Sequence, residues 1–113
     1  MELNAYFKSI IEQDHEHIVI CDLNHTILYM NPSAIHDYAK YGGAALLGRS
    51  LMNCHNPKSV EAIQKVVDWF AVDKSHNLIF TYHDEKHDRD VYMVALRDDA
   101  GNLIGYYEKH ESR

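Results

Sequence analysis

The chain contains few of the residues that define several specialised classes of protein. Its 113 residues include only 2 Cys, 2 Pro and 5 Gly. The two cysteines, Cys21 and Cys54, are too few for a disulfide scaffold, so we expect free thiols in a reducing compartment. Low Pro and Gly content excludes collagen-like and low-complexity classes.

Long apolar runs are also absent. No run approaches the roughly 18 residues that a membrane-spanning helix needs. The segment Met1–Asp14 carries acidic residues and no long apolar run, which excludes a secretory signal peptide. We therefore expect a cytoplasmic location and no membrane partner.

Basic residues are outnumbered by acidic ones. Lys and Arg total 11 against 17 Asp and Glu, which gives a net charge of −6 with neutral histidines. Nucleic-acid-binding proteins normally carry a basic surface, so we expect no nucleic-acid partner. The 9 His are unusually many, and their protonation in mildly acidic water would reverse the sign of the net charge. We expect most of them to be solvated surface residues.

The remaining composition is that of one globular domain. Hydrophobic residues make up 46% and charged residues 25% of the chain, and this length supports a single core. Apolar residues near the N-terminus recur at three- and four-residue spacing, which predicts an amphipathic helix over residues 3–13. Its stripe is too apolar to leave in water, so we expect a homodimer that buries Leu3, Phe7, Ile10 and Ile11.

Two Asn-Pro pairs punctuate the chain. Asn31-Pro32 ends a strand, and either Asn31 or Ser33 caps the short helix that follows. Asn56-Pro57 opens the longest predicted helix, because Asn is a good N-cap and Pro suits the first helical position. Short apolar or alternating runs predict strands over residues 17–22, 26–30, 77–82, 90–97 and 103–108.

Four fragments in this order resemble a PAS domain over residues 15–109. The fragments are Ile18–Asp22, Ile27–Ala34, Leu46–Leu51 and the closing turn Arg97–Gly105. The resemblance implies an α+β fold, a five-stranded antiparallel sheet with small helices on one face and a flanking N-terminal helix. We therefore expect residues 1–14 to form that helix and residues 15–113 to form a single PAS domain.

The tetrapeptide Cys54-His55-Asn56-Pro57 is similar to an element of one bacterial PAS subgroup. Members of that subgroup carry Cys-His-Pro-Pro before the long helix, often in fusion with hemerythrin-like domains. Asn56 replaces the first proline here.

The resemblance also implies a cavity between the sheet and the small helices. We expect apolar and aromatic residues to line it, chosen from Ile20, Tyr29, Ile35, Tyr38, Leu47, Leu51, Ile63, Val67, Tyr92, Val94 and Tyr106. Tyr106 and Tyr107 are neighbours on a strand, so only one of them can face this cavity.

The cofactor is not identified by the sequence. Leu51 stands where light-sensing PAS relatives have their reactive cysteine, which argues against cysteinyl-flavin photochemistry. Haem needs an axial ligand, and the candidates are His55, Cys54 and His36. The alternative for His55 is a structural role at the start of the helix.

Metal and enzyme signatures are weak. His83 and His87, with Asp84 and Asp88, fall in a charged hairpin loop that we expect to be solvated, and His15-x-His17 supplies only two ligands. We expect no metal site. No Gly-rich phosphate loop, Gly-x-Ser-x-Gly or similar catalytic signature is present, so we expect no enzymatic activity.

Two functions remain open. In the first, the chain is a stand-alone sensor domain that binds a small ligand or cofactor and signals through protein contacts. In the second, it is a ligandless module for dimerisation or docking.

Overall fold

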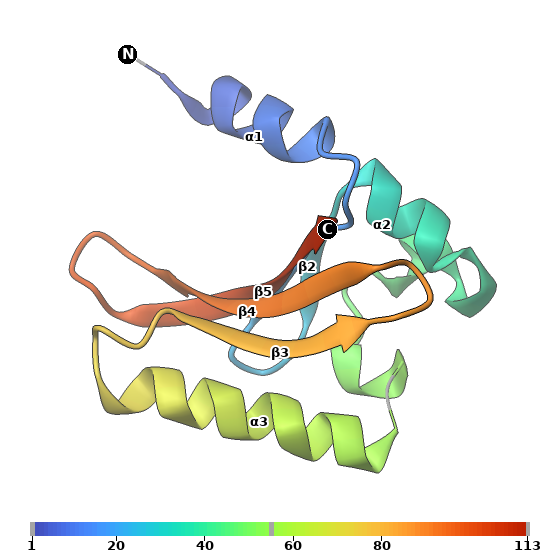
Figure 1. Ribbon diagram of the computed structural model, residues 1–113. Helices are drawn as coiled ribbons and strands as arrows, with labels where there is room; N and C mark the ends of the chain where they lie inside the picture. The colour runs from blue at the N-terminus through green and yellow to red at the C-terminus, as the bar shows by residue number, and fades with distance from the viewer. Residues whose placement is uncertain (1, 55, 113) are drawn as a thin grey trace.

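The chain folds as an antiparallel sheet with helices on both sides (Figure 1). The structure is a computed structural model that describes residues 2–54 and 56–112, with the side chain of Cys54 excepted. The sheet has the strand order β2-β1-β5-β4-β3, and its hydrogen-bonded pairs are all antiparallel. The strands are β1 (Val19–Asp22), β2 (Ile27–Met30), β3 (Leu78–Asp84), β4 (Arg89–Arg97) and β5 (Leu103–Ser112).

The inner face of the sheet carries most of the helices. They are α2 (Pro32–Asp37), the 3₁₀ turns η1 (Ala39–Tyr41), η2 (Gly43–Leu46) and η3 (Leu51–Cys54), and α3 (Pro57–Val72). Helix α1 (Asn4–Glu12) lies on the opposite side of the sheet from α3 (Figure 1). The core lies between the inner face and its helices, and includes Val19, Ile27, Ala34, Leu46, Leu51, Ile63, Val67, Phe70, Met93 and Tyr106. Among the described residues, no helix is long and apolar enough to cross a membrane.

The two Asn-Pro pairs both start helices, as predicted. Asn31 and Asn56 have nearly the same backbone geometry, and their side chains accept hydrogen bonds from Ala34 N and Ser59 N. Asn31 rather than Ser33 is therefore the cap of α2. The predicted α+β class and the five strands are confirmed, although β5 extends to Ser112, beyond the predicted end at residue 108.

Asn31 also joins three segments through its side chain. Its Oδ1 accepts a second hydrogen bond from Ile18 N at 2.9 Å. Its Nδ2 donates to the carbonyl oxygens of Ile11 at 3.1 Å and Glu16 at 3.0 Å. The residue is fully buried, and it connects the end of α1, the start of β1 and the start of α2.

At Gly105, strand β5 lies very close to the backbone of β1. An added Cβ at this position would lie 2.3 Å from the carbonyl oxygen of Cys21 on β1. The reason for this close approach is the pairing of β1 with β5, which places Gly105 opposite Asp22.

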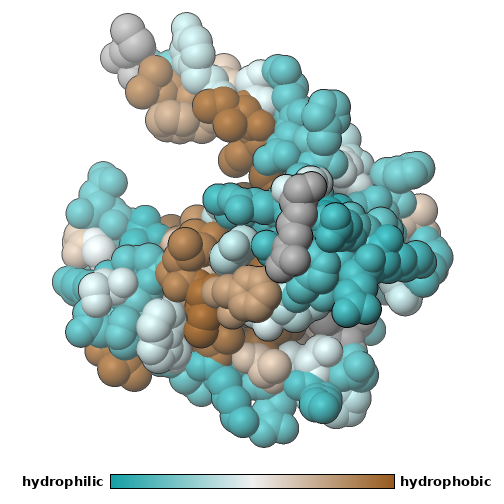
Figure 2. Space-filling view, viewed as in Figure 1, coloured by the Kyte–Doolittle hydropathy of each residue, from teal (hydrophilic) through white to brown (hydrophobic). Residues whose placement is uncertain are grey.

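The outer face of the sheet is largely apolar along one row of paired residues. Ile20 pairs with both Tyr29 and Tyr107, and Val94 pairs with both Tyr107 and Leu78. No residue of α1 is buried, and Phe7 and Ile10 are 56% and 71% exposed. Figure 2 shows the apolar side of α1 facing the open space above the sheet.

Candidate functional site

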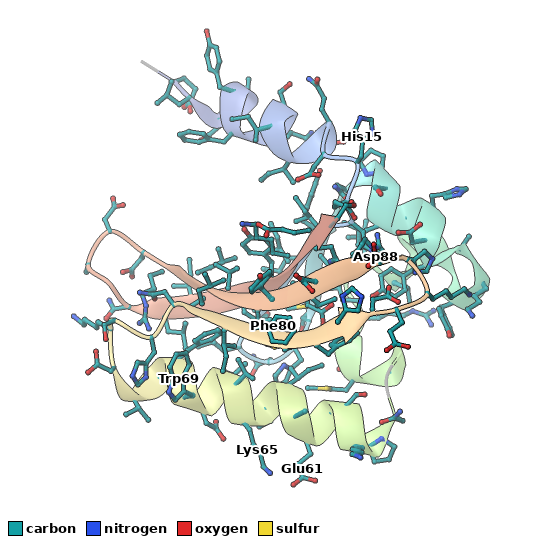
Figure 3. All side chains as sticks on the ribbon, in the orientation of Figure 1. His15, Glu61, Lys65, Trp69, Phe80 and Asp88 are labelled. Carbon is teal, nitrogen blue, oxygen red and sulfur yellow. The ribbon has the colours of Figure 1, made fainter. Side chains whose placement is uncertain are left out.

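An open groove of about 370 Å³ lies between α3 and the strands β3, β4 and β5. Helix α3 forms one wall and the edge strand β3 forms the rim, where Phe80 is labelled in Figure 3. The lining residues are Ser59, Ala62, Ile63, Val66, Phe80, Thr81, Tyr82, Met93 and Glu108.

The groove combines apolar walls with a few polar groups. The Thr81 hydroxyl donates a hydrogen bond of 2.8 Å to the carbonyl oxygen of Val91, so its lone pairs remain acceptors. Burial raises the pKa of the Tyr82 phenol, and the nearby carboxylate of Glu108 adds to the rise. Tyr82 is therefore a neutral donor or acceptor, and Glu108 is the charged group of the lining.

A partly buried hydrogen-bonded chain runs through His25 between the sheet and α3. Nε2 of His25 is 2.7 Å from Oε1 of Gln64, and Nδ1 of His25 is 2.7 Å from the Tyr106 hydroxyl. The Gln64 amide nitrogen donates to Asp68, so its oxygen accepts from His25. Nδ1 of His25 consequently accepts from Tyr106. The chain connects β5, the β1–β2 turn and α3.

A second buried cluster is built on two histidines from opposite ends of the sequence. His17 precedes β1 and His110 lies on β5, and they are 8% and 6% exposed. Their Nε2 atoms are 2.5 Å apart, and Nδ1 of His17 is 3.1 Å from Oδ2 of Asp37. Oε2 of Glu108 is 3.9 Å from Nε2 of His110.

Both imidazoles of this cluster are neutral near pH 7. Burial lowers the pKa of His17, and the charge of Arg89 lowers it further. Burial lowers the pKa of His110 to about 3, with further contributions from His17 and Arg89. Nδ1 of His110 is buried and has no hydrogen-bond partner among the described residues.

Comparison with known families gives one match across most of the chain. The family described as PAS domain matches residues 8–109. The chain belongs to the PAS domain family. PAS domains are sensory and signalling modules that are generally not enzymes and often mediate protein–protein contacts.

Solved structures show the same PAS fold. A C-terminal domain from Streptococcus mutans is 20% identical with a TM-score of 0.72, and the match covers 94% of this chain and 81% of that one. A PAS domain from Colwellia psychrerythraea is 14% identical with a TM-score of 0.72, over 99% and 98% of the two chains. An RNA-binding light-oxygen-voltage receptor is 15% identical with a TM-score of 0.70, over 97% of this chain and 32% of that one. No curated protein matches.

The predicted position of the PAS cavity is wrong. The space between the sheet and the small helices, lined by residues that include Tyr38 and Leu51, has no room for water. These side chains pack in or against the core instead. The open groove lies further along the inner face, against the long helix, because the edge strand β3 leaves α3 partly uncovered.

The residues predicted to line the cavity divide between the two faces of the sheet. Ile63 lines the groove, whereas Val67 and Tyr106 are buried in the core near it.

Tyr92 and Val94 alternate with buried Val91, Met93 and Ala95, so they face the outer side. Ile20 and Tyr29 also face outward, beside Phe7 and Ile11 of α1. The expectation that these four outward residues line the cavity is wrong.

Ile35 packs against the core from α2, and Leu47 is exposed at the end of η2. Neither residue reaches the groove.

Of the three predicted haem ligands, the structure describes only the side chain of His36. His36 is exposed on α2 and is absent from the groove lining. His55 lies outside the described residues, and so does the side chain of Cys54. The described lining contains no imidazole and no thiol, so it does not fit haem held by a histidine or cysteine ligand.

Sequence reasoning missed the histidines that the fold buries. His17 and His110 are 93 positions apart, and His25 and Tyr106 are 81 positions apart. No short motif brings such residues together, because their contacts arise from the pairing of β1 with β5. The sequence signal was the period-2 spacing that puts His17 on the same face as Val19 and Cys21, and His110 on the same face as Tyr106.

Proposed function

We propose that this PAS domain is a sensor that binds a small, mainly apolar molecule in the groove between α3 and β3–β5. The groove carries the proposal, because its volume of about 370 Å³ falls within the range of small-molecule sites. Ligand binding in the groove would change the contacts that this domain makes with another protein. This role agrees with the sensory function of PAS domains in general.

The lining suggests the chemistry of the ligand. Ile63, Val66 and Met93 offer an apolar wall, which favours a hydrocarbon or aromatic body. Glu108 offers a carboxylate, which favours a cationic or hydrogen-bond-donating group on the ligand. An anionic ligand is disfavoured, since it would approach this carboxylate without a basic residue in the lining.

The first experiment looks for a retained ligand. Native mass spectrometry and an electronic spectrum are recorded on protein purified without refolding. Extra mass that is released on denaturation supports the sensor function. Soret or flavin bands would instead identify a cofactor for which the described groove offers no ligand side chain.

The second experiment fills the groove. Ala62 lines it on α3, and Ala71 lies on the same helix outside it. We expect Ala62→Trp to abolish binding of the neutral dye Nile red, while Ala71→Trp binds it like the unchanged protein. Equal dye binding by all three proteins, or none by the unchanged protein, would contradict the groove as a ligand site.

The exposed stripe of α1 supports a second function, a module for dimerisation or docking. Leu3, Phe7 and Ile10 are exposed over an apolar sheet face, and together they form a surface that a second copy would cover. The sensor remains our first proposal, because the dimer surface and the groove lie on opposite faces and a sensor can use both.

A further inference from the structure

Hydrogen bonds within the protein do not satisfy all four ring nitrogens of the buried pair His17 and His110. Asp37 accepts a hydrogen bond from Nδ1 of His17, which places the proton on Nδ1 and a lone pair on Nε2. That lone pair points at Nε2 of His110, only 2.5 Å away. A proton on Nε2 of His110 would satisfy this contact but would leave Nδ1 of His110 as a buried, unpaired acceptor.

The other tautomer of His110 directs two lone pairs at each other. This arrangement is repulsive unless a cation accepts both lone pairs. Neutral imidazoles with their second nitrogen bonded to a carboxylate are the usual histidine ligands of metal ions, and His17 with Asp37 has this arrangement.

A third ligand is already in place. One atom each from His17, His110 and Glu108 lies within 4.8 Å of the others. Two imidazoles and one carboxylate form a donor set that suits Zn²⁺ and related divalent transition metals, and that leaves a coordination position open.

We propose that His17, His110 and Glu108 bind one divalent transition-metal ion of the Zn²⁺ type. This site does not depend on a ligand in the groove, although Glu108 belongs to both. A tetrahedral ion would require the two Nε2 atoms to separate from 2.5 Å to about 3.3 Å. His17 lies outside the paired strand β1, so this shift requires a movement of its side chain and not of a strand residue.

The surrounding charges balance the ion. The positive charge of Arg89 lowers the pKa of both histidines, and the same charge disfavours a bound metal ion. Its guanidinium group is paired with Glu16 at 2.9 Å and lies 3.9 Å from Asp37. Glu16, Asp37 and Glu108 together carry more negative charge than Arg89 carries positive charge, so the region as a whole attracts a cation.

The test uses the tag-free chain after removal of metals with EDTA. Isothermal titration with ZnCl₂ and elemental analysis after dialysis should give one Zn²⁺ per chain. Titration with CoCl₂ should give the visible bands of a tetrahedral or five-coordinate Co²⁺ site. Absence of stoichiometric binding would overturn the proposal and leave a hydrogen-bonded imidazole pair.

Variants locate the ion. We expect His110→Ala and Glu108→Gln each to weaken Zn²⁺ binding at least tenfold. His87→Ala is the matched control, since His87 is an exposed histidine paired with Asp84 in the β3–β4 loop. Loss of binding in His87→Ala with full binding in His110→Ala would move the site to that loop and contradict the proposal.

A measurement on the unchanged protein covers the case in which a variant does not fold. Long-range ¹H–¹⁵N spectra report each imidazole nitrogen separately. Addition of Zn²⁺ should shift Nε2 of His17 and His110 and leave the nitrogens of His25 unchanged. Shifts confined to other histidines would overturn the assignment.

Discussion

The hydroxyl group of Tyr106 donates a hydrogen bond of 2.7 Å to Nδ1 of His25, a buried imidazole whose tautomer is set by its bond to Gln64. The other nitrogen of His25 donates to Gln64 on α3. The two bonds connect the central strand of the sheet to the long helix that forms one wall of the groove.

Removal of this hydroxyl should destabilise the fold. We expect Tyr106→Phe to lower the free energy of unfolding by about 1–2 kcal/mol, because Nδ1 of His25 loses its donor in a buried site. Urea denaturation followed by circular dichroism measures the change. Tyr107→Phe is the control on the other face of β5, where we expect a change within about 0.5 kcal/mol. Equal effects of the two substitutions would contradict the role assigned to the bond.

The two Asn-Pro caps allow a matched comparison. Asn31→Ala should cost about 3 kcal/mol, because it removes the buried cap of α2 and leaves part-buried groups of Ile18 and Glu16 without their partner. Asn56→Ala removes one exposed cap bond and should cost about 1 kcal/mol. Thermal unfolding of both variants measures the difference. A larger loss of stability in Asn56→Ala than in Asn31→Ala would contradict a greater stabilising contribution of the buried Asn31.

Gly105 should tolerate no side chain. Gly105→Ala places a methyl group 2.3 Å from the carbonyl oxygen of Cys21, so β1 and β5 must separate, and we expect a loss of about 3 kcal/mol. Gly48→Ala is the comparison: space is open there, and only its backbone angle φ of 82° opposes the substitution. We expect a cost of about 1 kcal/mol at Gly48. Denaturant midpoints of the two variants decide whether the clash outweighs the backbone strain.

The intact chain should dimerise through α1. Burial of its exposed apolar stripe favours association. Light scattering should give a dimer at micromolar concentration, and Phe7→Glu should give a monomer because it places a charge in the stripe. Ala5→Glu places the same charge on the opposite side of α1 and should remain dimeric. A monomeric intact chain would refute the prediction, and a dimeric Phe7→Glu variant would move the interface to the sheet.

Local signals in the sequence predicted most of the elements but not their contacts. The Asn-Pro pairs and the alternating runs act over a few residues, and they placed the helices and strands well. Alternation on β4 identified two faces without showing which face is buried, and Tyr92 and Val94 were assigned to the wrong one. The pairing of β1 with β5 depends on residues far apart in the chain, so His17 and His110 gave no recognisable pattern.

Asn31 holds α1 near one end only, so a rotation about this point moves the other end of the helix. The side chain holds the carbonyl oxygen of Ile11, near the end of the helix, while the rest of α1 stays clear of the core. The seven residues Asn4–Ile10 extend about 10 Å from this pivot, so a rotation of about 10° would move the far end by about 2 Å. A small displacement of α2 or β1, both bonded to the same asparagine, is thereby enlarged at the N-terminal end of α1.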